Sequence, residues 1–327
     1  MLVVTGGAGF IGSVLVAMLN ERGRGDVLVV DEFETGPKWK NLRGKQFLDV
    51  VSPERFAHDL TAGAYDGQKS GGIDGILHIG AITDTSFPDM DVLMARNVRY
   101  TRTLARWCAA AGVRFVYASS ASVYGDGTLG FSDDAALTPK LLPQNPYAFS
   151  KWLSDTEMLR DGWNGAAGLR FFNVFGPNEY HKGRMASVPW HAFGQIRETG
   201  QIKLFQSHKE GYADGEQARD FVYVKDVCAT VLWFLDHPDA AGIYNVGVGK
   251  ARTFNDLAAA IFKALDKPVD ITYIPTPENI RAAYQYHTEA DLTRLRAVGC
   301  DVPFLSLEDA VVDYVKGYLS HDDNPYL

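Results

Sequence analysis

The sequence has little cysteine and no cysteine pattern of a recognised kind. Cys108, Cys228 and Cys300 are the only three, and they lie far apart without C-x-x-C spacing. Neither a disulfide framework nor a zinc site is therefore indicated. Few, unpaired cysteines fit a reducing compartment. We expect no metal site and a cytoplasmic location.

Long apolar runs and an excess of positive charge are also missing. No stretch approaches the roughly 20 apolar residues of a transmembrane helix, and because an apolar strand pattern starts at residue 2, we expect no signal peptide. The net charge of −8 disfavours general affinity for nucleic acid or an anionic membrane. The chain has 327 residues, of which 46% are hydrophobic and 22% charged, enough for one large domain or two modest ones.

Short β-branched runs alternate with amphipathic segments, a pattern typical of βαβ units. Strands are expected at residues 2–5, 27–31, 46–50, 75–79, 114–118 and 168–172, and a helix at 97–112. From about Phe171 onward the alternation loosens, which is where a lobe covering a substrate would grow. The predicted fold class is α/β, a Rossmann-type doubly wound parallel sheet with a smaller C-terminal substrate-binding lobe.

The first twelve residues indicate a dinucleotide site. An apolar strand runs into a glycine-rich turn and then a helix, and Gly7, Gly9 and Gly12 fit the G-x-G-x-x-G pattern, while Gly6 keeps the same three-residue spacing. Such glycines allow a tight turn, close approach of backbone to a pyrophosphate, and packing of helix on strand. A second apolar strand ends in Asp31, about 20 residues on, where an acid can bind an adenosine ribose.

A second group of residues indicates proton transfer. Tyr147 and Lys151 stand four residues apart, on one face of an expected helix. A phenol with a pKa of about 10 is a poor base at neutral pH, but a nearby ammonium and a nicotinamide cation both favour the phenolate. Ser120, just after the strand at 114–118, would bind the same substrate oxygen. We predict that Tyr147 exchanges a proton with a substrate hydroxyl and that Lys151 also reaches the nicotinamide ribose.

Five blocks of the sequence together resemble the extended short-chain dehydrogenase/reductase family that acts on nucleotide sugars. The blocks are residues 5–12, 119–125, the Tyr147-x-x-x-Lys151 motif, 170–177 and 219–227. The resemblance implies a dinucleotide-binding Rossmann domain of residues 1–172 and 219–247. Residues 173–218 and 248–327 would form the substrate-binding lobe, which grips the nucleoside diphosphate.

Residues 178–188, 203–205 and 284–292 resemble a subgroup of this family that epimerises an ADP-linked heptose for lipopolysaccharide synthesis. This closer resemblance implies that Lys182 is a second acid/base, beside Ser120, Tyr147 and Lys151. It implies an ADP-sugar substrate bound by Asn173, His191, Phe205, Arg219 and Tyr284, and we expect Arg184 to bind the substrate as well. The expected cofactor-binding residues are Gly6, Gly9, Phe10, Ile11, Gly12, Asp31, Glu32, Lys38, Gly80, Ala81, Asn97, Tyr147, Lys151 and Val174.

Physical reasoning supports two acid/base groups. Inversion of a hydroxyl-bearing carbon through a ketone returns a hydride to the opposite face, so the hydroxyl proton must be handled from two positions. Tyr147 and Lys182 could supply them, although Lys182 could instead only bind phosphate. Arg219 could clamp a pyrophosphate through two hydrogen bonds or merely pair with Asp220. His191, by its spacing alone, fits helix packing.

The chain departs from the subgroup at several positions. Ile79 replaces a usual glutamate, Arg184 replaces a small serine, His208 stands where Gly-Ser is common, and the loop at 207–218 is longer. We therefore expect the substrate pocket to differ in detail from that of the subgroup. The remaining alternatives are a 4-epimerase or reductase acting on another nucleotide sugar and, from a different class, a non-catalytic dinucleotide sensor.

The sequence contains residues that favour NAD and residues that favour NADP. Asp31 and Glu32 would repel a 2′-phosphate and so favour NAD. Lys38 could offset one of these charges, and the resembled subgroup tends to use NADP. We expect NADP, tightly bound and recycled, with NAD as the alternative, in a protein that forms a homo-oligomer.

Overall fold

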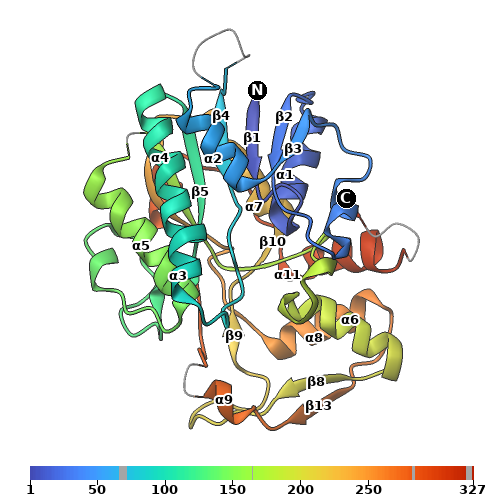
Figure 1. Cartoon of the computed structure of the whole chain (residues 1–327). Coiled ribbons are helices and arrows are strands. Elements are labelled where there is room, and N and C mark those ends of the chain that lie inside the picture. The colour runs from blue at the N-terminus through green and yellow to red at the C-terminus, as the bar shows by residue number, and fades with distance from the viewer. Residues whose placement is uncertain (66–71, 164, 282–283, 322–325) are drawn as a thin grey trace.

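The computed structural model describes residues 1–65, 72–163, 165–281, 284–321 and 326–327. Its centre is a seven-stranded parallel sheet in the order β11-β6-β5-β4-β1-β2-β3 (Figure 1). The strands are β1 (Leu2–Thr5), β2 (Val27–Val30), β3 (Asp49–Val51), β4 (Gly75–His78), β5 (Arg114–Ser120), β6 (Ala166–Phe171) and β11 (Gly242–Val246). The predicted Rossmann-type α/β class is confirmed.

Successive strand residues point to opposite faces of the sheet, and each face is covered by its own helices. Val3 and Phe115 pack toward α2, α4 and α5, whereas Val4 and Val116 pack toward α1 and α7. Burial on both faces explains why the strands read as continuous apolar runs. The helices are α1 (Phe10–Glu21), α2 (Pro53–Thr61), α3 (Met90–Leu93), α4 (Tyr100–Ala111), α5 (Pro146–Asp161) and α7 (Val224–Asp236).

Five of the six expected strands lie within two residues of their predicted bounds, but the third does not. It was expected at 46–50 and forms at β3, because Gly44 has a φ of +74° and the N–H of Lys45 bonds to Leu42 in a turn. The expected helix at 97–112 is split: a π-helical segment at Met94–Arg99 precedes α4. Strand β11 was not among the expected strands.

A buried ion pair fixes α5 to the sheet. Asp155 of α5 and Arg170 of β6 are both fully buried, and their Oδ2 and Nε atoms are 2.8 Å apart. The same carboxylate accepts hydrogen bonds from the hydroxyls of Tyr117 and Ser119 on β5. Because removal of one partner from a buried pair typically costs about 3–5 kcal/mol, α5 is held firmly on β5 and β6.

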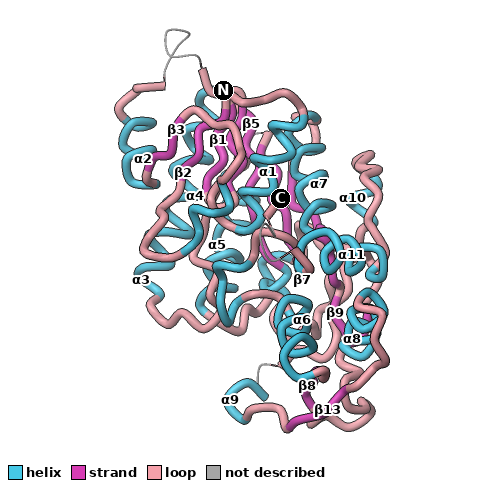
Figure 2. The backbone as a smooth tube through the Cα atoms, turned by 90° about the vertical axis from the view of Figure 1, so that its right-hand side faces the viewer, coloured by secondary structure: helices cyan, strands magenta, loops and turns pink. Residues whose placement is uncertain are grey.

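A smaller part of the molecule lies below the sheet (Figures 1 and 2). There α6 (Val188–Thr199) packs on α8 (Phe254–Ala264) and on a parallel pair, β8 (Ile202–Phe205) and β13 (Ile271–Ile274). Two short pairs run between the two parts, β7 (Asn173–Phe175) with β10 (Phe221–Tyr223) and β9 (Ala218–Arg219) with β12 (Arg252–Thr253). The remaining helices are α9 (Glu278–Arg281), α10 (Thr293–Ala297) and α11 (Leu307–Tyr314).

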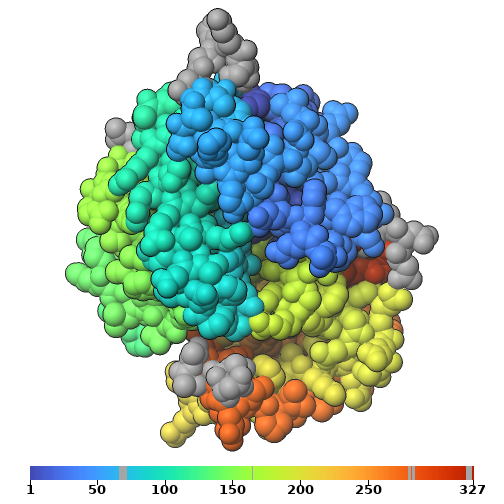
Figure 3. Space-filling view, in the orientation of Figure 1, coloured from blue at the N-terminus to red at the C-terminus, as the bar shows by residue number. Residues whose placement is uncertain are grey.

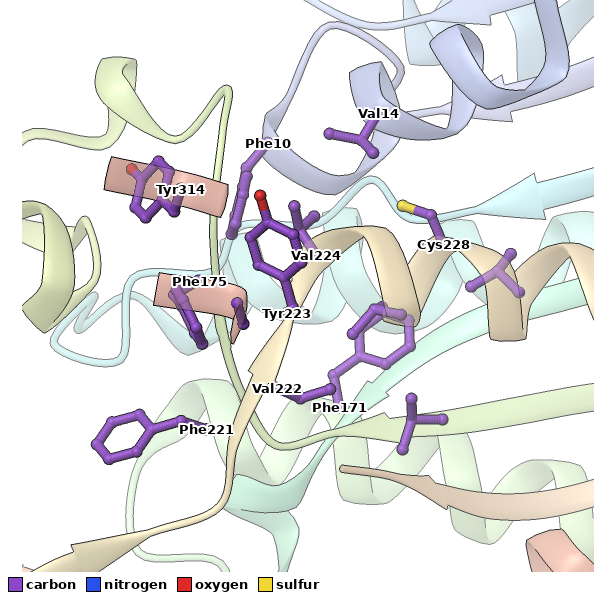
Figure 4. Packing of buried hydrophobic residues seen from close by; sticks show 14 of the residues in the cluster. Phe10, Val14, Phe171, Phe175, Phe221, Val222, Tyr223, Val224, Cys228 and Tyr314 are labelled. Atoms are coloured by element: carbon purple, nitrogen blue, oxygen red, sulfur yellow. The ribbon is translucent and has the colours of Figure 1, made fainter. Parts of the chain in front are cut away.

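Apolar side chains join the start of α1 to β10 and α11 (Figure 4). Phe10 lies beside Tyr223, and the Phe175 ring centroid is 5.5 Å from that of Tyr223 and 6.2 Å from that of Tyr314. The Tyr314 hydroxyl donates to Glu179 at 2.9 Å. This core therefore anchors the chain just before Lys182.

Within the described residues, no helix combines the length and the apolar run needed to cross a bilayer. The same residues contain no group of three or more His, Cys, Asp or Glu side chains placed to hold a metal ion.

Candidate active site

The glycine-rich turn joins β1 to α1 at the carboxyl edge of the sheet. Gly6 has a φ of +66°, and a Cβ added there would lie 2.6 Å from Cα of Gly80. A Cβ on Gly12 would lie 2.1 Å from the Gly6 carbonyl oxygen. Gly9 begins α1 without a side-chain cap, which leaves the first amides of the helix available to an anion. The turn thus fits the pyrophosphate of a dinucleotide.

Asp31 closes β2 beside this turn. Its Oδ2 accepts from the N–H of Ala8 at 2.8 Å, and its Oδ1 lies 2.5 Å from Nζ of Lys38. Glu32 is paired as well, with Arg96 at 2.6 Å. Each of the two acids that would repel a 2′-phosphate therefore has a cation beside it.

Ser120, Tyr147 and Lys151 come together where β5 meets α5. Tyr147 and Lys151 are 8% and 4% exposed, and Lys151 donates to the carbonyl of Ala118 at 2.8 Å. Burial raises the pKa of Tyr147, and only its hydrogen bond with Ser120 opposes that shift. Burial also lowers the pKa of Lys151 to about 8. Desolvation is the largest influence on both groups, because burial disfavours the charged form of each.

Lys182 lies in a 3-10 turn, Tyr180–Met185, next to the start of α1. Its Nζ is 5.3 Å from the centroid of the Phe10 ring. Burial lowers the pKa of Lys182 below that of an ordinary lysine, and Glu179 opposes the shift. Lys182 is therefore placed at the dinucleotide edge of the sheet with an amine that loses its proton more readily than usual.

Arg219, Tyr284 and Phe205 form a second cluster, in the lower part of the molecule. The guanidinium carbon of Arg219 is 5.3 Å from the Tyr284 ring centroid, which is 6.4 Å from that of Phe205. Asp220 does not pair with Arg219; its carboxylate accepts the backbone N–H groups of residues 248, 249 and 290 instead. The simple ion-pair interpretation of Arg219 is therefore wrong.

The other expected substrate residues are more scattered. Asn173 is exposed at the start of β7, beside the half-buried Val174. His191 is half-buried on α6 with its ring centroid 4.9 Å from that of Trp190. The surface is hollowed between the upper and lower parts of the molecule, as Figure 3 shows.

Two expected ligand-binding residues bond to the protein itself. Asn97, expected at the cofactor, is buried and bonds to both backbone groups of Ile82 and to the hydroxyl of Ser150. Arg184, expected at the substrate, pairs with Asp84 at 2.5 Å. Contacts of these two residues with a ligand stay predictions.

No sequence pattern pointed to Asn41. Its side-chain N–H₂ group donates to the carbonyl of Ala8 at 3.0 Å and to that of Asn178 at 3.1 Å, and lies 3.2 Å from Nδ1 of His181. It thereby ties the glycine-rich turn to the segment that precedes Lys182. Asn41 and Asn178 are 137 residues apart, so no local sequence pattern predicts their contact.

Comparison with known proteins agrees with this geometry. The model of the NAD dependent epimerase/dehydratase family matches residues 2–247. The chain is 48% identical, over the full length of both proteins, to the ADP-L-glycero-D-manno-heptose-6-epimerase of Nitratidesulfovibrio vulgaris. It is 42% identical to the Fusobacterium nucleatum protein of the same name, with 99% of each chain covered.

Solved structures agree with the sequence relatives. The Helicobacter pylori ADP-L-glycero-D-manno-heptose-6-epimerase has a TM-score of 0.79 at 28% identity, covering 97% of this chain and 95% of that one. A UDP-N-acetylglucosamine 4-epimerase from Methanobrevibacter ruminantium has a TM-score of 0.78 at 25% identity, with 98% of each chain covered. The chain belongs to the NAD dependent epimerase/dehydratase family, and its full-length relatives there are ADP-L-glycero-D-manno-heptose-6-epimerases.

Proposed function

We propose that the protein converts ADP-D-glycero-D-manno-heptose to ADP-L-glycero-D-manno-heptose by inverting C6. The observation that carries this proposal is the presence of two proton-transfer groups, the buried Tyr147 and the half-buried Lys182, on separate elements at the carboxyl edge of the sheet. The names of the full-length relatives support the choice of an ADP-linked heptose. A 4-epimerase is the second candidate, favoured by the structural likeness to one.

The chain's own groups would divide the reaction between them. The glycine-rich turn, with Asp31 and Lys38, would hold a nicotinamide dinucleotide, which would supply reversible hydride transfer at C6. Tyr147, hydrogen-bonded to Ser120, transfers the hydroxyl proton on one face of the sugar carbon, and Lys182 transfers it on the other. Arg219 is suited to the diphosphate, since a guanidinium matches phosphate oxygens.

The test is to incubate the protein with ADP-D-glycero-D-manno-heptose and follow the C6 proton by NMR. We expect epimerisation without added oxidant and without net formation of reduced cofactor, because the hydride returns to the sugar. In deuterated water C6 stays protiated. Reduced cofactor formed in proportion to product would mean a dehydrogenase, and deuterium at C6 would mean a carbanion route.

We also propose NADP as the cofactor, because Lys38 and Arg96 stand beside the two acids at the end of β2. Mass spectrometry of the ligand released on denaturation should find NADP, and NAD alone would contradict the proposal. Lys38→Met should weaken NADP binding far more than NAD binding, since only NADP carries the 2′-phosphate. Lys316→Met, at an exposed lysine paired with Asp266, is the matched control.

Three further expectations remain proposals. Residues 1–172 and 219–247 would bind the dinucleotide, and residues 173–218 and 248–327 the ADP-sugar. The protein would act in the cytoplasm as a homo-oligomer. Size-exclusion chromatography with light scattering would measure the oligomeric state.

A further inference from the structure

We propose that Arg184 is a positioning residue, which holds the turn carrying Lys182 at a fixed place relative to Tyr147 through the segment between β4 and α3. The inference rests on the proposed function, because it assigns two acid/base groups to one reaction. It differs from the expectation of a direct substrate contact by Arg184. One path of backbone and hydrogen bonds connects the turn at Lys182 with Tyr147.

The path begins with an ion pair between distant segments. Arg184 donates to Oδ2 of Asp84 at 2.5 Å and to the hydroxyl of Ser86 at 2.8 Å, about a hundred positions earlier in the chain. Asp84 is itself oriented, since its Oδ1 accepts the N–H and the hydroxyl of Ser86 at 2.8 and 2.7 Å. Those bonds, together with Arg184, lower the pKa of Asp84. Asp84 therefore stays ionised near neutral pH and in one orientation.

The segment that carries Asp84 is fixed to the body of the protein two residues earlier. The side chain of Asn97 accepts from the N–H of Ile82 at 2.9 Å and donates to its carbonyl at 3.0 Å. Asn97 also donates to the hydroxyl of Ser150 at 3.1 Å, and that hydroxyl donates to the backbone carbonyl of Tyr147 at 2.7 Å. The path thus ends in the first turn of the helix that holds Tyr147.

The turn at Lys182 needs such a tie. Gly183, between Lys182 and Arg184, has φ +54° and ψ −124°, a conformation open chiefly to glycine. Glu179 directly precedes the turn, and its carboxylate accepts hydrogen bonds from the N–H and the hydroxyl of Ser187, which follows the turn. These bonds hold the two ends of the turn together. Arg184 adds the link across to the β4–α3 segment, which descends beside this turn in Figure 1.

Loss of the Arg184–Asp84 ion pair should affect the reaction rate more than the stability of the fold. Arg184 is 67% exposed, and an exposed ion pair typically contributes little to folding stability. A displacement of about 1 Å at a reacting group, in contrast, can lower a rate by about 10²-fold. Loss of the pair should therefore leave the protein folded and slow its chemistry.

The experiment is a double-mutant cycle on the full-length protein with its cofactor. We expect Arg184→Gln and Asp84→Asn each to lower kcat about tenfold, within the range for small displacements, with KM nearly unchanged. The double variant should be no slower than either single one, because both remove the same link. Arg184→Lys, which keeps the charge, should recover part of the rate. Arg22→Gln, at an exposed pair with Asp236 at the C-terminal end of α1, should change nothing.

Other outcomes would overturn the inference. If Arg184→Gln raised KM and Asp84→Asn did not, Arg184 would bind substrate directly. If the two single effects multiplied in the double variant, the residues would act separately. Unchanged kcat in both single variants would leave the pair without a role in the reaction.

A measurement without substrate separates this inference from the proposed function. Hydrogen exchange should become faster at residues 180–187 and 82–86 in Arg184→Gln and in Asp84→Asn, and stay unchanged in Arg22→Gln. If the original protein fails to epimerise the ADP-heptose but exchange responds in this way, the function is wrong and the positioning link stands. If the protein is active and exchange does not respond, the link is wrong and the function stands.

Discussion

Tyr147→Phe should lower the turnover number by roughly 10²–10⁴-fold, the range for loss of a positioned acid/base, and leave cofactor and ADP-sugar binding intact. The variant removes only the phenol oxygen, whose hydrogen bond with Ser120 lies at the end of β5. The ring stays buried, so the fold should persist.

The control for this variant is Tyr273→Phe. That tyrosine is partly exposed on β13 and donates to Asn255, away from β5 and α5. Its turnover should match the unmodified protein. A Tyr147→Phe protein that purified without cofactor would show that the hydroxyl holds the dinucleotide, and the acid/base role would fall.

Lys182→Met should abolish epimerisation in both directions, because each direction needs one group to remove the hydroxyl proton and the other to return it. Methionine keeps most of the apolar stem beside Phe10 and deletes the amine. Burial lowers the pKa of Lys182, so its amine becomes neutral at a lower pH than the amine of an ordinary lysine does. A lysine in that state can accept a proton.

Steady-state rates in each direction, with Lys316→Met beside them, would measure this effect. A lysine that only bound phosphate would behave differently: its loss would raise KM and nearly preserve turnover at saturating substrate. That result would leave Tyr147 as the sole acid/base and favour the 4-epimerase alternative.

The sequence predicted the Rossmann core well because its signals are local. An apolar strand, a glycine that needs positive φ at Gly6 and a glycine packed against the turn at Gly12 lie within a dozen residues. Tyr147 and Lys151 are one helical turn apart, so their meeting follows from helix geometry.

What the sequence did not predict depends on contacts between distant segments. Strand β11 contains Asn245, whose side chain bonds to Phe131 and Asp291. The pairing of Arg184 with Asp84 cannot be found from spacing, since either residue alone resembles an ordinary surface charge. Likewise, pKa shifts at Tyr147 depend on burial, which no local motif specifies.

The Asp155–Arg170 pair has a consequence for changing what this protein accepts. Substitution of either residue leaves a charge stranded in the core, so library members that change Asp155 or Arg170 should be mostly insoluble. Phe205 and Tyr284, in contrast, meet through their ring edges in the lower part of the molecule. Directed evolution toward other sugar nucleotides should therefore find its tolerated changes there, in the smaller part of the molecule, while the proton-transfer helix stays as it is.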